Sequence, residues 1–195
     1  MFPGSNWMQK WFAMMALVVS GLASATEIGG VKIEDSAKVS GQELNLVGGG
    51  VRAKWGFARV YVGALYTAEK PSNADSVIYD NAHPRRVTLS MLRHVDGEKF
   101  QSSLSDGLEA NAGDNEMQTL QGSIHEMALL FERVHEVNEG DLITLDFIPG
   151  RGTLIAVHGS STFVPGDAFA RAMLRIWLGK NPVSSSLKWQ MLGNK

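Results

Sequence analysis

One cation stands out by its sequence context, because Arg52 closely follows a run of three glycines at positions 48–50. Glycines permit tight backbone turns, so they could direct the Arg52 guanidinium inward from the edge of a sheet. A guanidinium fixed in an apolar cleft binds a carboxylate or a phenolate strongly. Most arginines are instead solvated or paired with a nearby acid. The pattern therefore nominates Arg52 as an anion-binding residue and leaves its burial open.

Other side chains with useful chemistry are less distinctive. Tyr61 and Tyr66 are five residues apart, so on a regular strand they point to opposite faces and at most one faces a cleft. Arg93 shares a strand face with apolar side chains, which makes it either a strand-end charge or a second cleft cation. Trp177 lies in an apolar helical stretch and is more typical of a core residue than of a ligand platform.

Several classes of active site are excluded by the residues. The five histidines have neither H-E-x-x-H nor H-x-H spacing, and the glycine run is not followed by the Lys-Ser/Thr pair of a phosphate-binding loop. No G-x-S-x-G nucleophile motif occurs, and the aspartates lack the spacing of a calcium-binding loop. Because the chain contains no cysteine, disulfides and thiol nucleophiles are also excluded. We therefore expect neither a metal site nor a cofactor.

Composition bounds the kind of protein. The chain has 195 residues, of which 44% are hydrophobic, a content too high for a disordered chain. Its 18 basic residues against 20 acidic ones give a net charge of −2, and nothing in this balance indicates a nucleic-acid partner. No protein partner is indicated either.

The first 25 residues have the pattern of a secretory signal peptide. Lys10 precedes an apolar run, Trp11–Ala23, which ends in the small-x-small sequence Ala23-Ser24-Ala25. A membrane span needs roughly 20 apolar residues, so an uncleaved anchor is the weaker alternative. We expect cleavage between Ala25 and Thr26, a single domain over 26–195, no stable membrane span afterwards, and a periplasmic or secreted location.

Apolar periodicity predicts the elements that must position Arg52. Strands are expected at 31–39, 43–47, 60–66, 86–95, 141–147 and 153–157, and helices at 96–111, 115–137, 168–178 and 185–192. Asp96 is expected to cap the first helix through its carboxylate. Strands followed by helices and further strands indicate an α+β fold, with a mostly antiparallel sheet and helices on one face. A cleft between these layers is the default binding site.

Four sequence blocks carry a resemblance to a known family. They are Leu46–Arg52 (LVGGGVR), Val60–Tyr66 (VYVGALY), Gly140–Gly150 (GDLITLDFIPG) and Pro165–Gly179 (PGDAFARAMLRIWLG). In this order they resemble the chalcone isomerase family, and most closely its exported bacterial chalcone-isomerase-like branch. The resemblance extends over residues 31–193 and implies an open-faced β-sandwich, with helices layered on a long antiparallel sheet.

The resemblance also implies site residues. Enzymes of the family close a chalcone to a flavanone by attack of a phenolate oxygen on an enone, and their G-V-R arginine corresponds to Arg52. The family's active-site Thr falls at Tyr61, its Tyr at Phe100 and its Asn at Gly107. The hydroxyl and the amide that position the substrate are thus missing at the last two positions.

Three functions follow, in order of preference. The first is binding of a small apolar acid, fatty-acid-like or phenolic, by Arg52, Tyr61, Phe100 and Gly107, because non-catalytic family members hold a fatty-acid carboxylate with the same arginine. The second is an intramolecular lyase that acts on a phenolic enone, with Arg52 and Tyr61 as catalytic residues. The third is a structural envelope protein with a closed cleft.

Overall fold

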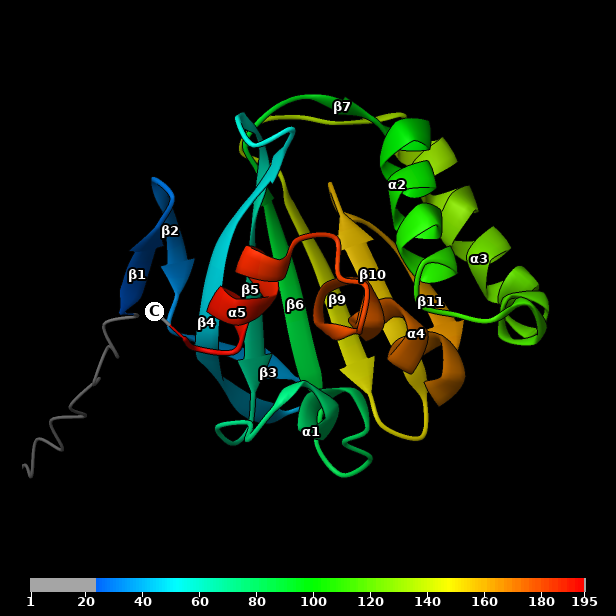
Figure 1. The fold of residues 1–195 in the computed structure, drawn as a ribbon, viewed down its shortest axis with the longest axis horizontal. Helices are drawn as coiled ribbons and strands as arrows, with labels where there is room; N and C mark the ends of the chain where they lie inside the picture. The colour runs from blue at the N-terminus through cyan, green and yellow to red at the C-terminus, as the bar shows by residue number, and fades with distance from the viewer. Residues whose placement is uncertain (1–23, 195) are drawn as a thin grey trace, which may run out of the picture.

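A seven-stranded antiparallel sheet forms the body of the protein in the computed structural model, which describes residues 24–194 (Figure 1). The strand order is β11-β10-β9-β6-β5-β4-β3. Neighbouring strands are antiparallel throughout. The strands are β3 (Ser36–Val39), β4 (Gln42–Lys54), β5 (Ala58–Thr67), β6 (Arg85–Met91), β9 (Leu142–Ile148), β10 (Gly152–Val157) and β11 (Ser160–Pro165).

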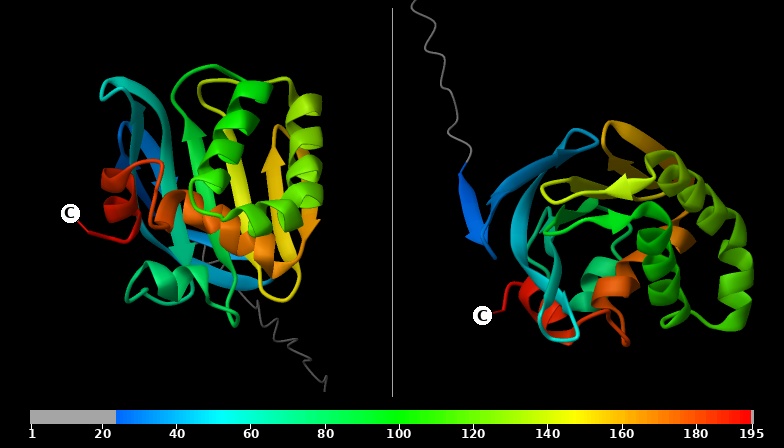
Figure 2. Two further views of the ribbon diagram at one scale, coloured as in Figure 1. Left: turned by 45° about the vertical axis from the view of Figure 1, so that its right-hand side comes forward. Right: turned by 90° about the horizontal axis from the view of Figure 1, so that it is seen from above.

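Helices cover one face of this curled sheet, as the two further views show (Figure 2). The helices are α1 (Ala74–Ile78), α2 (Gly97–Glu109), α3 (Asp114–Val134), α4 (Asp167–Leu178) and α5 (Ser185–Met191). The larger hydrophobic core lies between the sheet and the helices, and includes Phe131, Phe169 and Trp177. The predicted α+β architecture, an antiparallel sheet with helices on one face, is confirmed.

The opposite face of the sheet carries a smaller core. A hairpin of β1 (Ala25–Ile28) and β2 (Val31–Glu34) packs there, and Ile33 joins a second hydrophobic cluster with Val62 and Tyr66 of β5. The Tyr66 hydroxyl donates a hydrogen bond of 2.9 Å to the backbone oxygen of Glu34. This contact fastens the hairpin to the sheet.

Several expected elements have different bounds. The strand expected at 31–39 is two strands, β2 and β3, which separate at Asp35. The helix expected to reach residue 137 ends at Val134, because His135 has a positive φ of 62° and β8 (Glu136–Val137) then pairs with β7 (Val95–Asp96). The strand expected at 86–95 ends at Met91. Strand β11 and helix α1 were not predicted, because the first half of β11 is polar and α1 is only five residues long.

The capping prediction for Asp96 is wrong in its mechanism. Helix α2 does begin directly after Asp96, but the carboxylate forms no capping hydrogen bond with the helix backbone. It pairs instead with the Lys99 ammonium at 2.5 Å and lies 3.7 Å from the His94 ring. The Asp96 carboxylate therefore interacts with the Lys99 and His94 side chains rather than with the first backbone N–H groups of the helix.

The glycine run before Arg52 is also not a turn. Strand β4 continues through Gly48, Gly49 and Gly50 to Lys54, and none of the three has a positive φ. A Cβ atom at Gly48 would collide with the backbone oxygen of Gln190, and one at Gly50 with the Gln190 side chain. The glycines therefore allow α5 to lie directly against β4, a close approach that is a known reason for glycine within a strand.

The signal peptide expected at 1–25 lies almost wholly outside the described residues, and the cleavage position stays a prediction. Between residues 24 and 194, no helix is both long and apolar enough to cross a membrane. The same residues contain the seven-stranded sheet, its helices and both hydrophobic clusters, so we expect a chain that begins at Ser24 to fold.

Candidate functional site

A pocket of about 370 Å³ lies between the tip of the β4–β5 hairpin, β7 and the start of α2. Figure 1 shows these three segments together at one end of the sheet. The volume of the pocket lies within the range of small-molecule sites. Three segments line it: the hairpin, the chain between β6 and α2, and the first turns of α2. The lining residues are Arg52, Lys54, Trp55, Val60, Tyr61, Arg93, His94, Val95, Asp96, Lys99, Phe100 and Ser103.

Arg52 lies in this pocket, directly across the ladder from Tyr61. Its guanidinium carbon is 5.7 Å from the centre of the Tyr61 ring, which is within cation–π range. The register shift between Arg52 and Ala53 leaves Val60 of β5 as an extra residue opposite this point, a bulge of the kind that commonly redirects side chains. The side chain is half-buried, and within residues 24–194 no carboxylate pairs with it. The guanidinium is therefore available to an anionic ligand.

Tyr61 contributes its ring to the pocket and its hydroxyl to the core. The Trp177 indole N–H donates a 2.9 Å hydrogen bond to the Tyr61 hydroxyl oxygen, and both side chains are buried. Burial raises the pKa of Tyr61 to about 12, although the Arg52 charge and the Trp177 hydrogen bond act in the opposite direction. The phenol is consequently neutral at neutral pH. Tyr61 and Tyr66 belong to cores on opposite faces of the sheet, as predicted.

Phe100 forms part of the helix-side wall. It lies in α2, is buried, and packs against Phe131 of α3 with ring centres 5.2 Å apart and planes tilted by 49°. This geometry is a favourable aromatic pair. The pocket therefore has an apolar ring, with no hydroxyl, where the family resemblance places a tyrosine.

Gly107 is not brought into the same place. It is buried further along α2, where a Cβ atom would lie 2.8 Å from Cγ2 of Ile176 in α4, and it does not line the pocket. The glycine allows α2 and α4 to pack closely. Of the four site residues expected from the sequence, Arg52, Tyr61 and Phe100 thus meet at one pocket, whereas Gly107 faces another helix.

The pocket also contains basic side chains that the sequence analysis did not predict there, and one whose role it left undecided. Arg93 is an exposed residue just after the end of β6 and also lines the pocket, so the two alternatives, a strand-end charge and a cleft cation, both describe it. Lys54 and Lys99 join it, so the lining contains four basic side chains and a single carboxylate, that of Asp96. Lys54 was detectable, since it stands on the same hairpin as Arg52 at the same strand parity. Lys99 was not detectable, because no sequence pattern indicates the chain reversal that brings α2 to the pocket.

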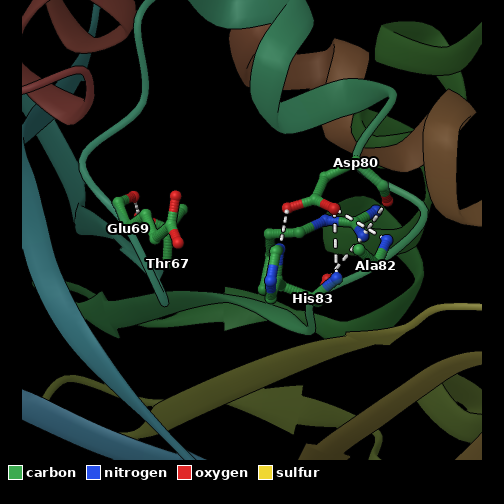
Figure 3. Close-up of polar contacts among 6 residues, drawn as sticks. Thr67, Glu69, Asp80, Ala82 and His83 are labelled. Atoms are coloured by element: carbon green, nitrogen blue, oxygen red, sulfur yellow. Dashed lines mark hydrogen bonds and ion pairs between the residues drawn. The ribbon is translucent and has the colours of Figure 1, made fainter.

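A second polar cluster lies at the other end of the sheet, beside α1 (Figure 3). The Asp80 carboxylate accepts backbone N–H bonds of 2.8 Å from Ala82 and 3.0 Å from His83. Burial alone would raise the pKa of Asp80, but these hydrogen bonds outweigh it and the pKa lies below its usual value. The buried Arg85 guanidinium donates to the backbone oxygens of Asp80 and His83. The cluster thus closes the α1–β6 connection and has a structural role.

The fold has a counterpart among solved protein structures. The fold is similar to that of a crystal structure of a fatty-acid binding protein from Arabidopsis thaliana, with a TM-score of 0.62 and 16% sequence identity over 84% of this chain and 92% of that one. At this identity the likeness concerns the fold alone. No curated protein matches the sequence.

The family follows from the sequence itself. A model of the chalcone isomerase-like family matches residues 25–193, nearly the whole described chain. The protein therefore belongs to the chalcone isomerase-like family, and the resemblance found in the four sequence blocks is confirmed.

Replacing Tyr61 by Phe tests whether its hydroxyl is a structural group. The change leaves the buried Trp177 indole N–H without its partner, so we expect a loss of about 1–2 kcal/mol in unfolding free energy. Ligand affinity should change less than twofold, because the ring and Arg52 remain. Urea unfolding and calorimetric titration measure the two quantities. A large loss of affinity at unchanged stability would instead place the hydroxyl in the binding site.

Proposed function

We propose that this protein binds a small apolar acid in the pocket, with the ligand carboxylate or phenolate on Arg52 and the apolar part against Tyr61 and Phe100. The observation that carries the proposal is the half-buried Arg52 guanidinium, which has no carboxylate partner among the described residues although it lies beside apolar and aromatic walls. A charge-assisted bond to such a guanidinium is about twice as strong as a neutral hydrogen bond. The similarity in fold to a fatty-acid binding protein supports the same ligand class.

Two features favour binding over catalysis. Ring closure of a phenolic enone requires donors that stabilise the charge on the developing enolate. Phe100 has no hydroxyl, and the Tyr61 hydroxyl lies in the core, where it accepts the Trp177 indole N–H. Arg52 and the other basic side chains of the lining supply positive charge, which suffices to bind an acid, but neither Phe100 nor Tyr61 directs a hydroxyl donor into the pocket.

The test is a calorimetric titration of residues 24–195 with saturated fatty acids of eight to eighteen carbons and with a hydroxychalcone, whose absorbance is followed in parallel. We expect saturable binding of an acid, much weaker binding of its methyl ester, and no loss of chalcone absorbance beyond the uncatalysed rate. A ligand at 100 times its Kd should also stabilise the fold by about 2.7 kcal/mol. Equal affinity for acid and ester would contradict the anion site, and chalcone turnover would contradict the absence of catalysis.

A further inference from the structure

The tip of the β4–β5 hairpin exposes two large aromatic side chains next to the mouth of the pocket. Trp55 and Phe57 are 75% and 80% exposed, the highest values among the large hydrophobic residues of the described chain. Only Gly56 separates them, and they connect the end of β4 at Lys54 to the start of β5 at Ala58. The hairpin tip projects at the end of the sheet that carries β7 (Figures 1 and 2). Exposed aromatics grouped in this way mark an interaction site.

The backbone holds this tip in an uncommon conformation. Trp55 has a φ of 53° and Gly56 a φ of 79°. Glycine adopts such values freely, but a bulky residue rarely does. The positive φ at both positions is characteristic of the tight turns that join two strands without splaying them. Trp55 and Phe57 are thus presented at the tip of the hairpin, and neither belongs to a hydrophobic core.

Basic residues surround the aromatic tip. The Lys54 ammonium lies 5.1 Å from the centre of the Trp55 ring, and Arg52 and Arg93 line the pocket immediately behind it. The one carboxylate of the pocket lining, Asp96, is already paired with Lys99. This local excess of positive charge contrasts with the chain as a whole, whose net charge is −2. Basic side chains therefore predominate in the pocket lining beside the exposed aromatics, while the acids Glu98 and Glu136 lie next to this lining on α2 and β8.

We infer that the hairpin tip docks on an anionic lipid bilayer, from which the pocket takes up its ligand. The tip, here residues 54–57, combines the two features that favour the bilayer interface. Aromatic rings partition to the level of the lipid headgroups, and each Lys or Arg near an anionic surface contributes about 1 kcal/mol of attraction. An acidic protein could also use two aromatics as anchors, but the neighbouring pocket suits an acid with an apolar tail, and a bilayer is where such a ligand concentrates.

The position of the tip connects docking with ligand uptake. Trp55 belongs both to the exposed tip and to the pocket lining, so a tip seated among lipid headgroups places the mouth of the pocket at the membrane surface. An acid with an apolar tail dissolved in a bilayer has its carboxylate at the headgroup level, where Arg52 then lies. This inference rests on the proposed function, since it names the source from which that same pocket is filled.

Phe57 provides a clean test, because it is highly exposed and does not line the pocket. Residues 24–195 would be sedimented with phosphatidylcholine vesicles that contain 30% phosphatidylglycerol, and with pure phosphatidylcholine vesicles. We expect binding to the anionic vesicles that weakens with salt, and about a tenfold loss of vesicle affinity in Phe57→Ser. Phe163→Ser is the matched control, since Phe163 is 41% exposed on the distant edge strand β11 and should not affect binding.

The outcomes separate the two proposals. Phe57→Ser should bind a water-soluble medium-chain fatty acid as tightly as the unchanged protein, and its melting temperature should be unchanged. Absence of vesicle binding, or an equal loss in Phe57→Ser and Phe163→Ser, would overturn docking and leave the acid site intact. Vesicle binding that depends on Phe57, in a protein that binds no acid, would retain docking and contradict the proposed function.

Discussion

Replacing Arg52 by Ala is expected to lower the affinity for a fatty acid by about 10- to 100-fold. A hydrogen bond to a charged group contributes about 1.5–3 kcal/mol to the binding free energy. The other cations of the lining remain in the variant, but they lie further along the hairpin, on the β6–α2 segment and on α2. Binding of the methyl ester should change little, because the ester has no charge for the guanidinium to hold. Calorimetric titration of both ligands with both proteins measures this difference.

Two further variants define what Arg52 contributes. Arg151→Ala removes an exposed arginine in the β9–β10 turn, outside the pocket, and should leave acid affinity unchanged. Arg52→Lys keeps the charge but loses the planar fork, so we expect an intermediate affinity. An Arg52→Ala protein that binds the acid normally would show that another cation of the pocket holds the carboxylate. Lys54 or Arg93 would then be the anion-binding residue.

Gly48→Ala is expected to destabilise the fold by about 3 kcal/mol, whereas Gly50→Ala should cost less than about 1 kcal/mol. A methyl group at Gly48 meets the backbone of Gln190 and Gly193, which cannot move unless the C-terminal segment is displaced. A methyl group at Gly50 meets chiefly the end of the flexible Gln190 side chain, which can rotate away.

The two alanine variants therefore control for each other, since both add a methyl group to the same strand and contact the same residue. Urea unfolding of residues 24–195 gives the free energies. Limited proteolysis should cleave first near α5 in Gly48→Ala, because that helix can no longer pack closely against β4. Similar stabilities for the two variants would contradict the close backbone contact between Gly48 and α5.

Much of the fold could be predicted from apolar spacing. The strands around residues 43–47, 60–66, 141–147 and 153–157 and the long helix expected at 115–137 all occur, because their apolar residues are spaced as each element buries them. The glycine run was misinterpreted for a physical reason. Glycine is equally compatible with a turn and with a strand that another backbone approaches, and only the position of α5 distinguishes the two.

The site was predictable in part, and only because the resemblance to a family aligned distant positions. Arg52 and Tyr61 are close along the hairpin, so their proximity follows from strand pairing. Phe100 reaches them through the β6–α2 connection, which has no periodic signal. The contact between Tyr61 and Trp177 joins residues 116 positions apart and could not be inferred from either segment alone. The same holds for Gly107, whose neighbour Ile176 lies in α4.

The close packing of α5 against the glycines of β4 has a consequence for biosynthesis. Strand β4 leaves the ribosome early, but residues 185–191, which cover its glycine face, are made long afterwards. Until then this face presents bare peptide backbone with no side chains to shield it. The hairpin that carries Arg52 and Tyr61 therefore reaches its final packing only after α5 has been synthesised, although every residue that lines the pocket is made before α5.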